Sequence, residues 1–317
     1  MKKIFNIVIK VLILIGFAYV IRNYISSNNW TDIGASISKD DLYSRWYLIP
    51  VIIILMPVNW LLESRKWHVV MNNYSEINYG SAIISILCGI TCGLLTPARV
   101  GEFMGRLLLV KSEDKKVSVY ASFLCSISQN IITLILGLAS VVVFITYINA
   151  IDIEVSTLLI VNVIIISIGL CFYYNHKTLI SYLSFTTFYK KHLLFISEHK
   201  VSLGLLNRVL LLSLLRYLVY GTQYVLILCF LGLSSALYYN VVAIGTIFLI
   251  QSTIPLPPMM GLLARGEIAV FVLGVLSYST PIGLLAAGLI WVINLICPAL
   301  LGLAYLMKMN IWKSVRQ

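Results

Sequence analysis

The sequence is poor in charge. Asp, Glu, Lys and Arg together make up 11% of its 317 residues, whereas 60% of the residues are hydrophobic and the mean hydropathy is +0.95. A typical soluble domain has roughly 25% charged residues. A soluble protein of this length could not bury so much apolar surface. The composition therefore excludes a soluble protein, and it predicts an all-α, polytopic helical membrane protein.

The sequence also lacks a polar segment long enough to fold into a soluble domain. Its longest polar connection runs from residue 175 to residue 208, and we assign it to the cytoplasm. We therefore expect residues 1–317 to form a single integral membrane domain without a soluble catalytic domain. The net charge of +11 then follows from membrane topology, and we predict no nucleic-acid partner.

Disulfide patterns and metal-ligand clusters are missing as well. All six cysteines lie in apolar segments, which argues against a disulfide framework or a CxxC site. We interpret Cys88 and Cys92, four residues apart, as packing residues. The four histidines lie in polar loops without the spacing of metal ligands. We predict neither a metal site nor a cofactor.

Six apolar segments approach the roughly 20 residues that a membrane-spanning helix requires. They are residues 4–21, 46–62, 117–147, 156–174, 209–231 and 281–307. The first follows Met1-Lys2-Lys3 as a signal peptide would, but no small-residue cleavage site precedes Arg22. We therefore interpret it as a retained helix.

Two further apolar stretches, residues 81–110 and 240–278, are interrupted by proline. The breaks are Thr96-Pro97 and Pro255-Leu256-Pro257-Pro258. Each half is short for a span, so we predict two re-entrant hairpins of half-helices. Pairs of tilted full spans are the alternative.

The distribution of Lys and Arg orients these segments. A cytoplasmic N-terminus leaves only Arg22, Lys39 and Arg45 of the 23 basic residues outside, and it assigns most of the others, Lys66 included, to cytoplasmic loops. Both termini are therefore predicted to be cytoplasmic in the cell (inner) membrane. The halves, approximately 46–147 and 209–307, then contain the same elements in opposite orientations. Such inverted repeats with broken helices are typical of transporters.

Charged residues flank both proline breaks inside the predicted membrane region. They are Arg99, Glu102, Arg106, Arg265 and Glu267. Such a charge near mid-bilayer costs roughly 2.5–3.5 kcal/mol. These five residues must therefore pair with one another, line a water-filled cavity, or both.

The first break has the pattern of a helix start. Thr96 is a typical N-cap and Pro97 a typical first helical residue. The free N–H groups of such a helix would attract an anion. Arg99, Glu102 and Arg106 would then share one helix face, which indicates a phosphate group as their ligand.

We predict a substrate site in which residues beside the second break bind the substrate from the side opposite to residues beside the first break. Its residues are Thr96, Arg99, Glu102, Arg106, Gln129, Asn130, Arg265 and Glu267. The alternative is that the five charges only hold the hairpins together. For Gln129, Asn130, Gln251 and Asn294, lining a cavity and bonding between helices are equally good interpretations. Arg216 is predicted to snorkel to the cytoplasmic interface.

These motifs resemble those of a known family. Leu95-Thr96-Pro97-Ala98-Arg99-Val100-Gly101-Glu102, followed by Arg106, resembles the P-x-R-x-G-E signature of the lysylphosphatidylglycerol synthetase transmembrane (flippase) domain family. Pro257-Pro258-Met259-Met260-Gly261 with Gly266-Glu267 resembles its second motif. The resemblance extends over nearly the whole chain. It implies a stand-alone member that moves a lipid with an anionic or modified head group between leaflets.

The chain also departs from the family pattern. Ser128-Gln129-Asn130 stands where members often have an acidic-basic pair, and Met259-Met260 stands where small glycines are usual. Members fused to an aminoacyl-transferase domain flip aminoacylated phosphatidylglycerol, but lysine transfer is not implied here. These departures leave the identity of the lipid open.

We therefore predict a flippase-like protein that translocates an anionic or phosphate-bearing lipid, or a lipid-linked sugar. The predicted partner is a membrane lipid with an anionic head group, and a homo-oligomer or an envelope-biosynthesis enzyme partner stays open. One alternative is a membrane-embedded lipid or glycan transferase, for which Glu102 and Glu267 are the available acids. The other is a non-catalytic partner of envelope-lipid enzymes.

Overall fold

The computed structural model describes most of the chain. The described residues are 39–96, 99–111, 114–148, 155–182, 184–186, 195–196, 201–233, 237–253, 258–278 and 280–309, with single residues at 11, 15, 19 and 22. The first predicted span, residues 4–21, therefore lies almost wholly outside the described residues. So do Pro97, Pro255 and Pro257 of the two predicted breaks.

The described part of the chain is helical. Its elements are α3 (Lys39–Ser44), α4 (Leu48–Met71), α5 (Tyr79–Leu94), α6 (Gly101–Leu107), α7 (Lys115–Ile148), α8 (Val155–Tyr174), α9 (His176–Ser181), α12 (Leu203–Phe230), α13 (Leu237–Thr253), α14 (Pro258–Val275), α15 (Thr280–Trp291), a π-helical turn η3 (Val292–Ile296) and α16 (Cys297–Lys308).

Within the described residues, four helical stretches are long and apolar enough to cross a membrane. They are Leu48–Met71, Lys115–Thr146, Leu203–Phe230 and Ile282–Lys308. Shorter apolar helices cover Tyr79–Leu94, Leu159–Tyr174 and Leu237–Thr253. These findings confirm the predicted all-α, polytopic membrane protein.

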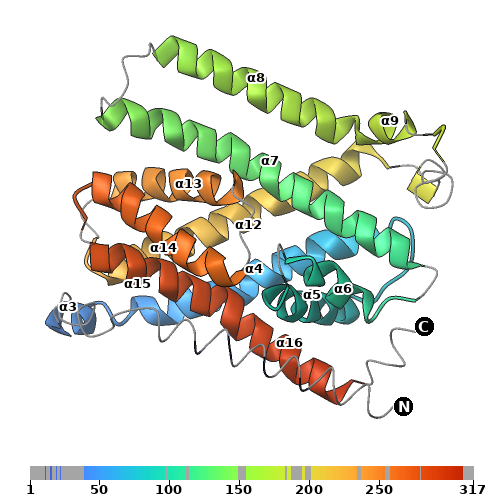
Figure 1. Cartoon of the computed structure of the whole chain (residues 1–317), viewed down its shortest axis with the longest axis horizontal. Coiled ribbons are helices and arrows are strands. Elements are labelled where there is room, and N and C mark those ends of the chain that lie inside the picture. The colour runs from blue at the N-terminus through green and yellow to red at the C-terminus, as the bar shows by residue number, and fades with distance from the viewer. Residues whose placement is uncertain are drawn as a thin grey trace.

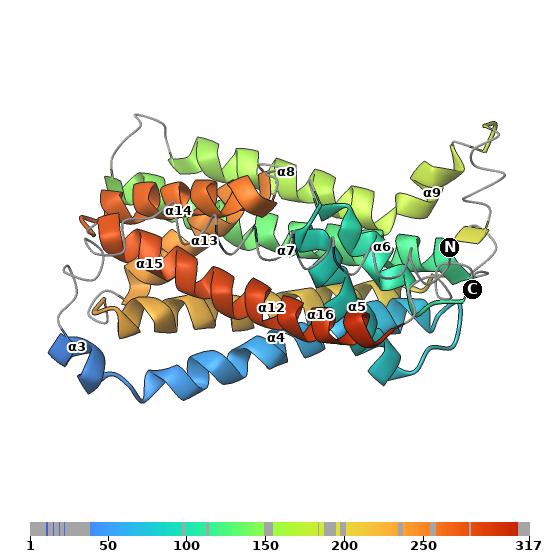
Figure 2. The same cartoon turned by 60° about the horizontal axis from the view of Figure 1, so that its bottom comes forward.

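The long helices run along one axis of the molecule, and the two broken stretches lie at opposite ends of it. Figures 1 and 2 show α4, α7, α8, α12 and α15–α16 along this axis. The pair α5–α6 lies at the end where α16 finishes, and the pair α13–α14 lies at the other end. Each member of a pair packs against the other.

Glycine allows α5 and α6 to pack closely. A Cβ atom at Gly101 or Gly105 would overlap the backbone of Cys92 or Cys88, respectively. Contacts therefore join residue 101 to 92 and residue 105 to 88, so the two helices are antiparallel. The carbonyl oxygen of Glu102 would lie only 2.9 Å from a Cβ atom at Gly89. Small residues thus bring the charged residues of α6 directly against α5.

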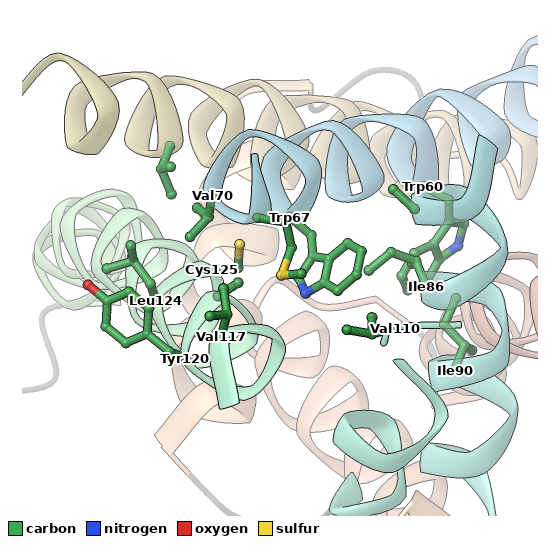
Figure 3. Close-up of a cluster of buried hydrophobic side chains, with 14 of the residues drawn as sticks. Trp60, Trp67, Val70, Ile86, Ile90, Val110, Val117, Tyr120, Leu124 and Cys125 are labelled. Carbon is green, nitrogen blue, oxygen red and sulfur yellow. The ribbon is translucent and has the colours of Figure 1, made fainter. Parts of the chain in front are cut away.

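Two apolar cores flank the middle of the bundle. In the first, side chains of α4, α5 and α7 gather around Trp67, which is fully buried, and Figure 3 shows Trp60 and Trp67 projecting from α4 towards Ile86 and Ile90. The second core joins α12, α13, α14 and α15 around residues such as Tyr224 and Ile247. Ridges of apolar side chains on neighbouring helices form both cores.

The helix boundaries correct two predictions. Helix α4 continues to Met71, nine residues beyond the predicted end of that span, so Glu63 and Lys66 lie inside a helix. Lys66 is only 1% exposed, and its assignment to a cytoplasmic loop was wrong. The predicted connection 175–208 is partly helical, because it includes α9 and because α12 begins at Leu203.

Candidate functional site

The carboxylate of Glu63 is the centre of a buried ion network. Lys66 Nζ lies 2.8 Å from Glu63 Oε2, and Arg216 NH1 lies 3.3 Å from the same oxygen. Arg106 NH2 lies 3.2 Å from Oε1. Because Glu63, Arg106 and Arg216 belong to α4, α6 and α12, this one side chain connects three elements that are far apart in the sequence.

Glu102 extends the network towards the first helix break. Its carboxylate forms ion pairs with Arg106 and with Arg99, whose NH2 lies 3.0 Å from Oε2. Arg106 thus contacts both carboxylates, and its side chain is buried, at 3% exposure. Arg99 is 35% exposed. The predicted grouping of Arg99, Glu102 and Arg106 is therefore present in the structure.

The backbone at Arg99 is unusual. Its φ is 58°, in the left-handed region that non-glycine residues rarely adopt. A right-handed helix cannot continue through this residue, so α6 starts at Gly101 and not at Pro97 as predicted. The Thr96 hydroxyl accepts a hydrogen bond from the Gly101 N–H at 2.7 Å and donates one to the Cys92 carbonyl at 3.2 Å. Thr96 thus links the end of α5 to the start of α6, close to Arg99.

A cavity of about 220 Å³ lies beside this network. Its lining includes three arginines, Arg99, Arg216 and Arg265, and no Asp or Glu among the side chains that the structure describes. Gln251 and Ser252, at the end of α13, also line it. Residues beside both helix breaks therefore line the cavity.

Aromatic rings and amide groups complete the lining. The rings are those of Trp60, Tyr217, Tyr220, Phe248 and Trp291. The amides are those of Asn59, Gln129, Gln251 and Asn294. This mixture of apolar walls with a few polar groups is typical of ligand sites.

The three arginines of the lining have unpaired donors in or behind the wall of the cavity. The Nε atoms of Arg99 and Arg216 are buried without a hydrogen-bond acceptor. Arg265 makes neither a hydrogen bond nor an ion pair with any residue of the described chain. A buried donor without a partner costs about 1–3 kcal/mol. An anion in the cavity would give the Arg265 guanidinium the partner that it lacks among the described residues.

The prediction for Arg216 was wrong. Its guanidinium carbon lies 5.0 Å from the centre of the Trp60 ring, and its NH1 contacts Glu63. A cation above an aromatic face is stabilised by the ring quadrupole. The side chain therefore points into the protein and does not reach for the interface.

A chain of amides braces the opposite wall of the cavity. Asn59 donates to the Asn294 side chain at 3.0 Å, Asn294 donates to Gln223, and Gln223 donates to the Ile52 carbonyl at 2.7 Å. All three amide side chains are buried. The chain therefore ties α4 to α12 and to the π-helical turn η3.

Proline explains why the helix changes its pitch at η3. Pro298 has no N–H, so the carbonyl of Asn294, four residues earlier, loses its usual helical partner. The Trp60 indole donates to this carbonyl at 3.0 Å. Single π-helical turns occur frequently at functional sites. Asn294 thus both lines the cavity and bonds between helices.

Gln129 also fills both predicted roles. Its Oε1 accepts from Lys66 at 3.2 Å and from Arg216 at 3.4 Å, and its Nε2 donates to the Ser213 carbonyl at 3.3 Å. The adjacent Asn130 is exposed and does not line the cavity. Glu267 is likewise exposed and away from the cavity, although Arg265 two residues earlier lines it.

Sequence reasoning missed Glu63, Lys66 and the inward direction of Arg216. A signal was available for the first two residues. The apolar residues Trp67, Val69, Val70 and Met71 continue the helical pattern past the charges. Charges at positions i and i+3 within such a pattern indicate a buried pair as well as they indicate the end of a span.

Together these features define a multi-pass helical membrane protein with an arginine-lined cavity between two broken helical stretches. Residues 7–302 match the lysylphosphatidylglycerol synthase TM region family. The chain therefore belongs to this family, which confirms the resemblance seen in its motifs. No curated protein and no solved structure matches the chain significantly.

The network predicts a sharp difference between two carboxylates. Glu63→Gln should lower the free energy of unfolding by about 3–5 kcal/mol, because it removes the shared partner of three buried or half-buried cations. Glu267→Gln removes an exposed carboxylate and should change it by less than about 0.5 kcal/mol. Thermal unfolding of the purified variants in detergent measures both. Equal unfolding temperatures would contradict the role assigned to Glu63.

Proposed function

We propose that the protein translocates a phosphate-bearing anionic lipid between the two leaflets of the cell membrane. The head group binds in the cavity between Arg99, Arg216 and Arg265, and the acyl chains stay in the bilayer. The observation that carries this proposal is the cavity itself, where three guanidinium groups converge without a described carboxylate in the lining. Membership of the family supports it as well.

The two helix pairs are the proposed moving parts. We interpret α5–α6 and α13–α14 as re-entrant hairpins that enter the membrane from opposite sides, within an inverted repeat. Their location at opposite ends of the bundle supports this interpretation (Figures 1 and 2). Arg99 beside the first break and Gln251 and Ser252 beside the second reach the same cavity. In transporters, broken helices of this kind usually mark the substrate site.

Binding would proceed by exchange of partners. Arg99 and Arg216 are 35% and 21% exposed, whereas the carboxylates that pair with them, Glu102 and Glu63, are 20% and 6% exposed. A phosphate that enters the cavity can therefore reach the two guanidinium groups but not Glu63. Arg106 and Lys66, at 3% and 1% exposure, stay behind and hold the carboxylates in place.

Removal of Arg265 tests this proposal most cleanly. Since Arg265 pairs with no described carboxylate, Arg265→Gln leaves no buried acid without its cation. We expect it to reduce lipid translocation at least tenfold in liposomes that contain phosphatidylglycerol or phosphatidic acid with a fluorescent acyl chain. The measurement is the fraction of label that dithionite reduces from outside over time.

Arg208→Gln is the matched control. Arg208 lies on α12, the same helix as Arg216, but its side chain is exposed. This variant should translocate lipid at the wild-type rate. Equal rates in the wild type, Arg265→Gln and protein-free liposomes would refute translocation, and a covalently altered lipid would favour the transferase alternative.

We further propose that the end of the bundle where α16 finishes faces the cytoplasm. Basic residues gather near the helix ends there, including Lys111, Lys115, Lys116, Lys177 and Lys308, which agrees with the positive-inside rule (Figure 1). In a cysteine-free background, a membrane-impermeant maleimide should label Tyr43→Cys in intact cells and Lys308→Cys only after permeabilisation. The reverse pattern would invert the assignment.

A further inference from the structure

We infer that the cavity takes a head group with at least two negative charges and no ammonium group, as in a lipid phosphomonoester or diphosphate. This inference rests on the proposed function and narrows its substrate class. It follows from the charge that the network leaves uncompensated and from the place where that charge lies.

The network contains more cations than carboxylates. Lys66, Arg99, Arg106, Arg216 and Arg265 are its bases and lining arginines. Glu63 and Glu102 are its only carboxylates within the described part of the chain. If each carboxylate neutralises one cation, three formal positive charges remain. Uncompensated charge inside a membrane protein is unfavourable, so a ligand that supplies negative charge is stabilised there.

The surplus faces the cavity and not the protein interior. Arg106 contacts both carboxylates, and Lys66 contacts Glu63, so Arg99 and Arg216 share their carboxylates with these two deeply buried cations. Arg99, Arg216 and Arg265 form the side that a ligand can reach. A phosphodiester with one negative charge would leave most of this surplus in place. A phosphomonoester carries about −1.5 to −2 at pH 7 and compensates much more of it.

The donor geometry points to the same chemistry. A terminal phosphate offers three acceptor oxygens, whereas a diester offers two that are not bridging. The cavity lining supplies the guanidinium groups of Arg99, Arg216 and Arg265, the last of which has no partner among the described residues. Three guanidinium groups can therefore donate to three terminal oxygens, and charge-assisted hydrogen bonds of this kind are the strong ones.

The same lining disfavours a head group with an amine. No described carboxylate is available to pair with an ammonium group in the cavity. The Trp60 ring, which could attract a cation, already carries the Arg216 guanidinium at 5.0 Å. An ammonium group would therefore meet like charge, which is a common basis of discrimination between ligands.

Matched lipids test the inference. The purified full chain in detergent is titrated with dioleoyl phosphatidic acid, dioleoyl phosphatidylglycerol and dioleoyl phosphatidylethanolamine, and binding is measured by native mass spectrometry. We expect phosphatidic acid to bind at least tenfold more tightly than phosphatidylglycerol. Phosphatidylethanolamine should bind to the wild type no more tightly than to the Arg265→Gln variant. Arg265→Gln should reduce the preference for phosphatidic acid over phosphatidylglycerol to about threefold or less, and Arg208→Gln should preserve this preference.

The outcomes separate this inference from the proposed function. Equal affinities for phosphatidic acid and phosphatidylglycerol, both lost in Arg265→Gln, would overturn the inference and leave lipid binding intact. Affinities that do not depend on Arg265 for any lipid would overturn the proposed site itself.

Soluble probes distinguish a lipid from a free phosphate compound. Sodium pyrophosphate should displace phosphatidic acid at concentrations where dimethyl phosphate, a monoanion, does not. Equal competition by the two anions would contradict the charge argument. Arg265-dependent binding of pyrophosphate without any binding of phosphatidic acid would support the charge argument but refute a lipid substrate.

Discussion

The structure depends on one buried carboxylate. Glu63 holds Lys66, Arg106 and Arg216 in an interior where unpaired ions are unstable, and Glu102 extends the same arrangement to Arg99. Breaking such a pair is costly because the remaining charge cannot reach water. The carboxylates therefore do two things at once. They make the embedded arginines tolerable, and they orient the outer arginines towards the cavity.

Two local departures from regular structure lie in the wall of this cavity. They are the positive φ of Arg99 and the π-helical turn before Pro298, which contributes Asn294 and Leu295 to the lining. Each of them is unfavourable in a regular helix, and each brings a polar side chain to the cavity. Strain of this kind tends to accumulate at functional sites. The coincidence of these two features supports a site over a purely structural cluster.

Hydropathy located the spans well because helix length in a membrane follows from bilayer thickness. The described spans begin and end within a few residues of the prediction except at two places. Helix α12 begins at Leu203, ahead of the predicted residue 209, and α4 continues past charged residues that looked like the end of the span. The motif residues Arg99 and Arg265 were found because a charge beside a proline break is rare. The pairing of Glu63 with Arg216 was not predictable, since it joins residues of two helices far apart in the chain. The contrast between Gln129, in the cavity wall, and Asn130, exposed, depends on helix rotation, which a uniformly apolar segment does not reveal.

An experimental structure of the protein in lipid nanodiscs that contain phosphatidic acid tests the central claim most directly. The account predicts a phosphate within hydrogen-bond distance of Arg99, Arg216 and Arg265, with Glu63 still paired to Arg106 and Lys66. A structure in which the three guanidinium groups point away from one another, and in which Glu63 contacts none of these cations, would contradict it.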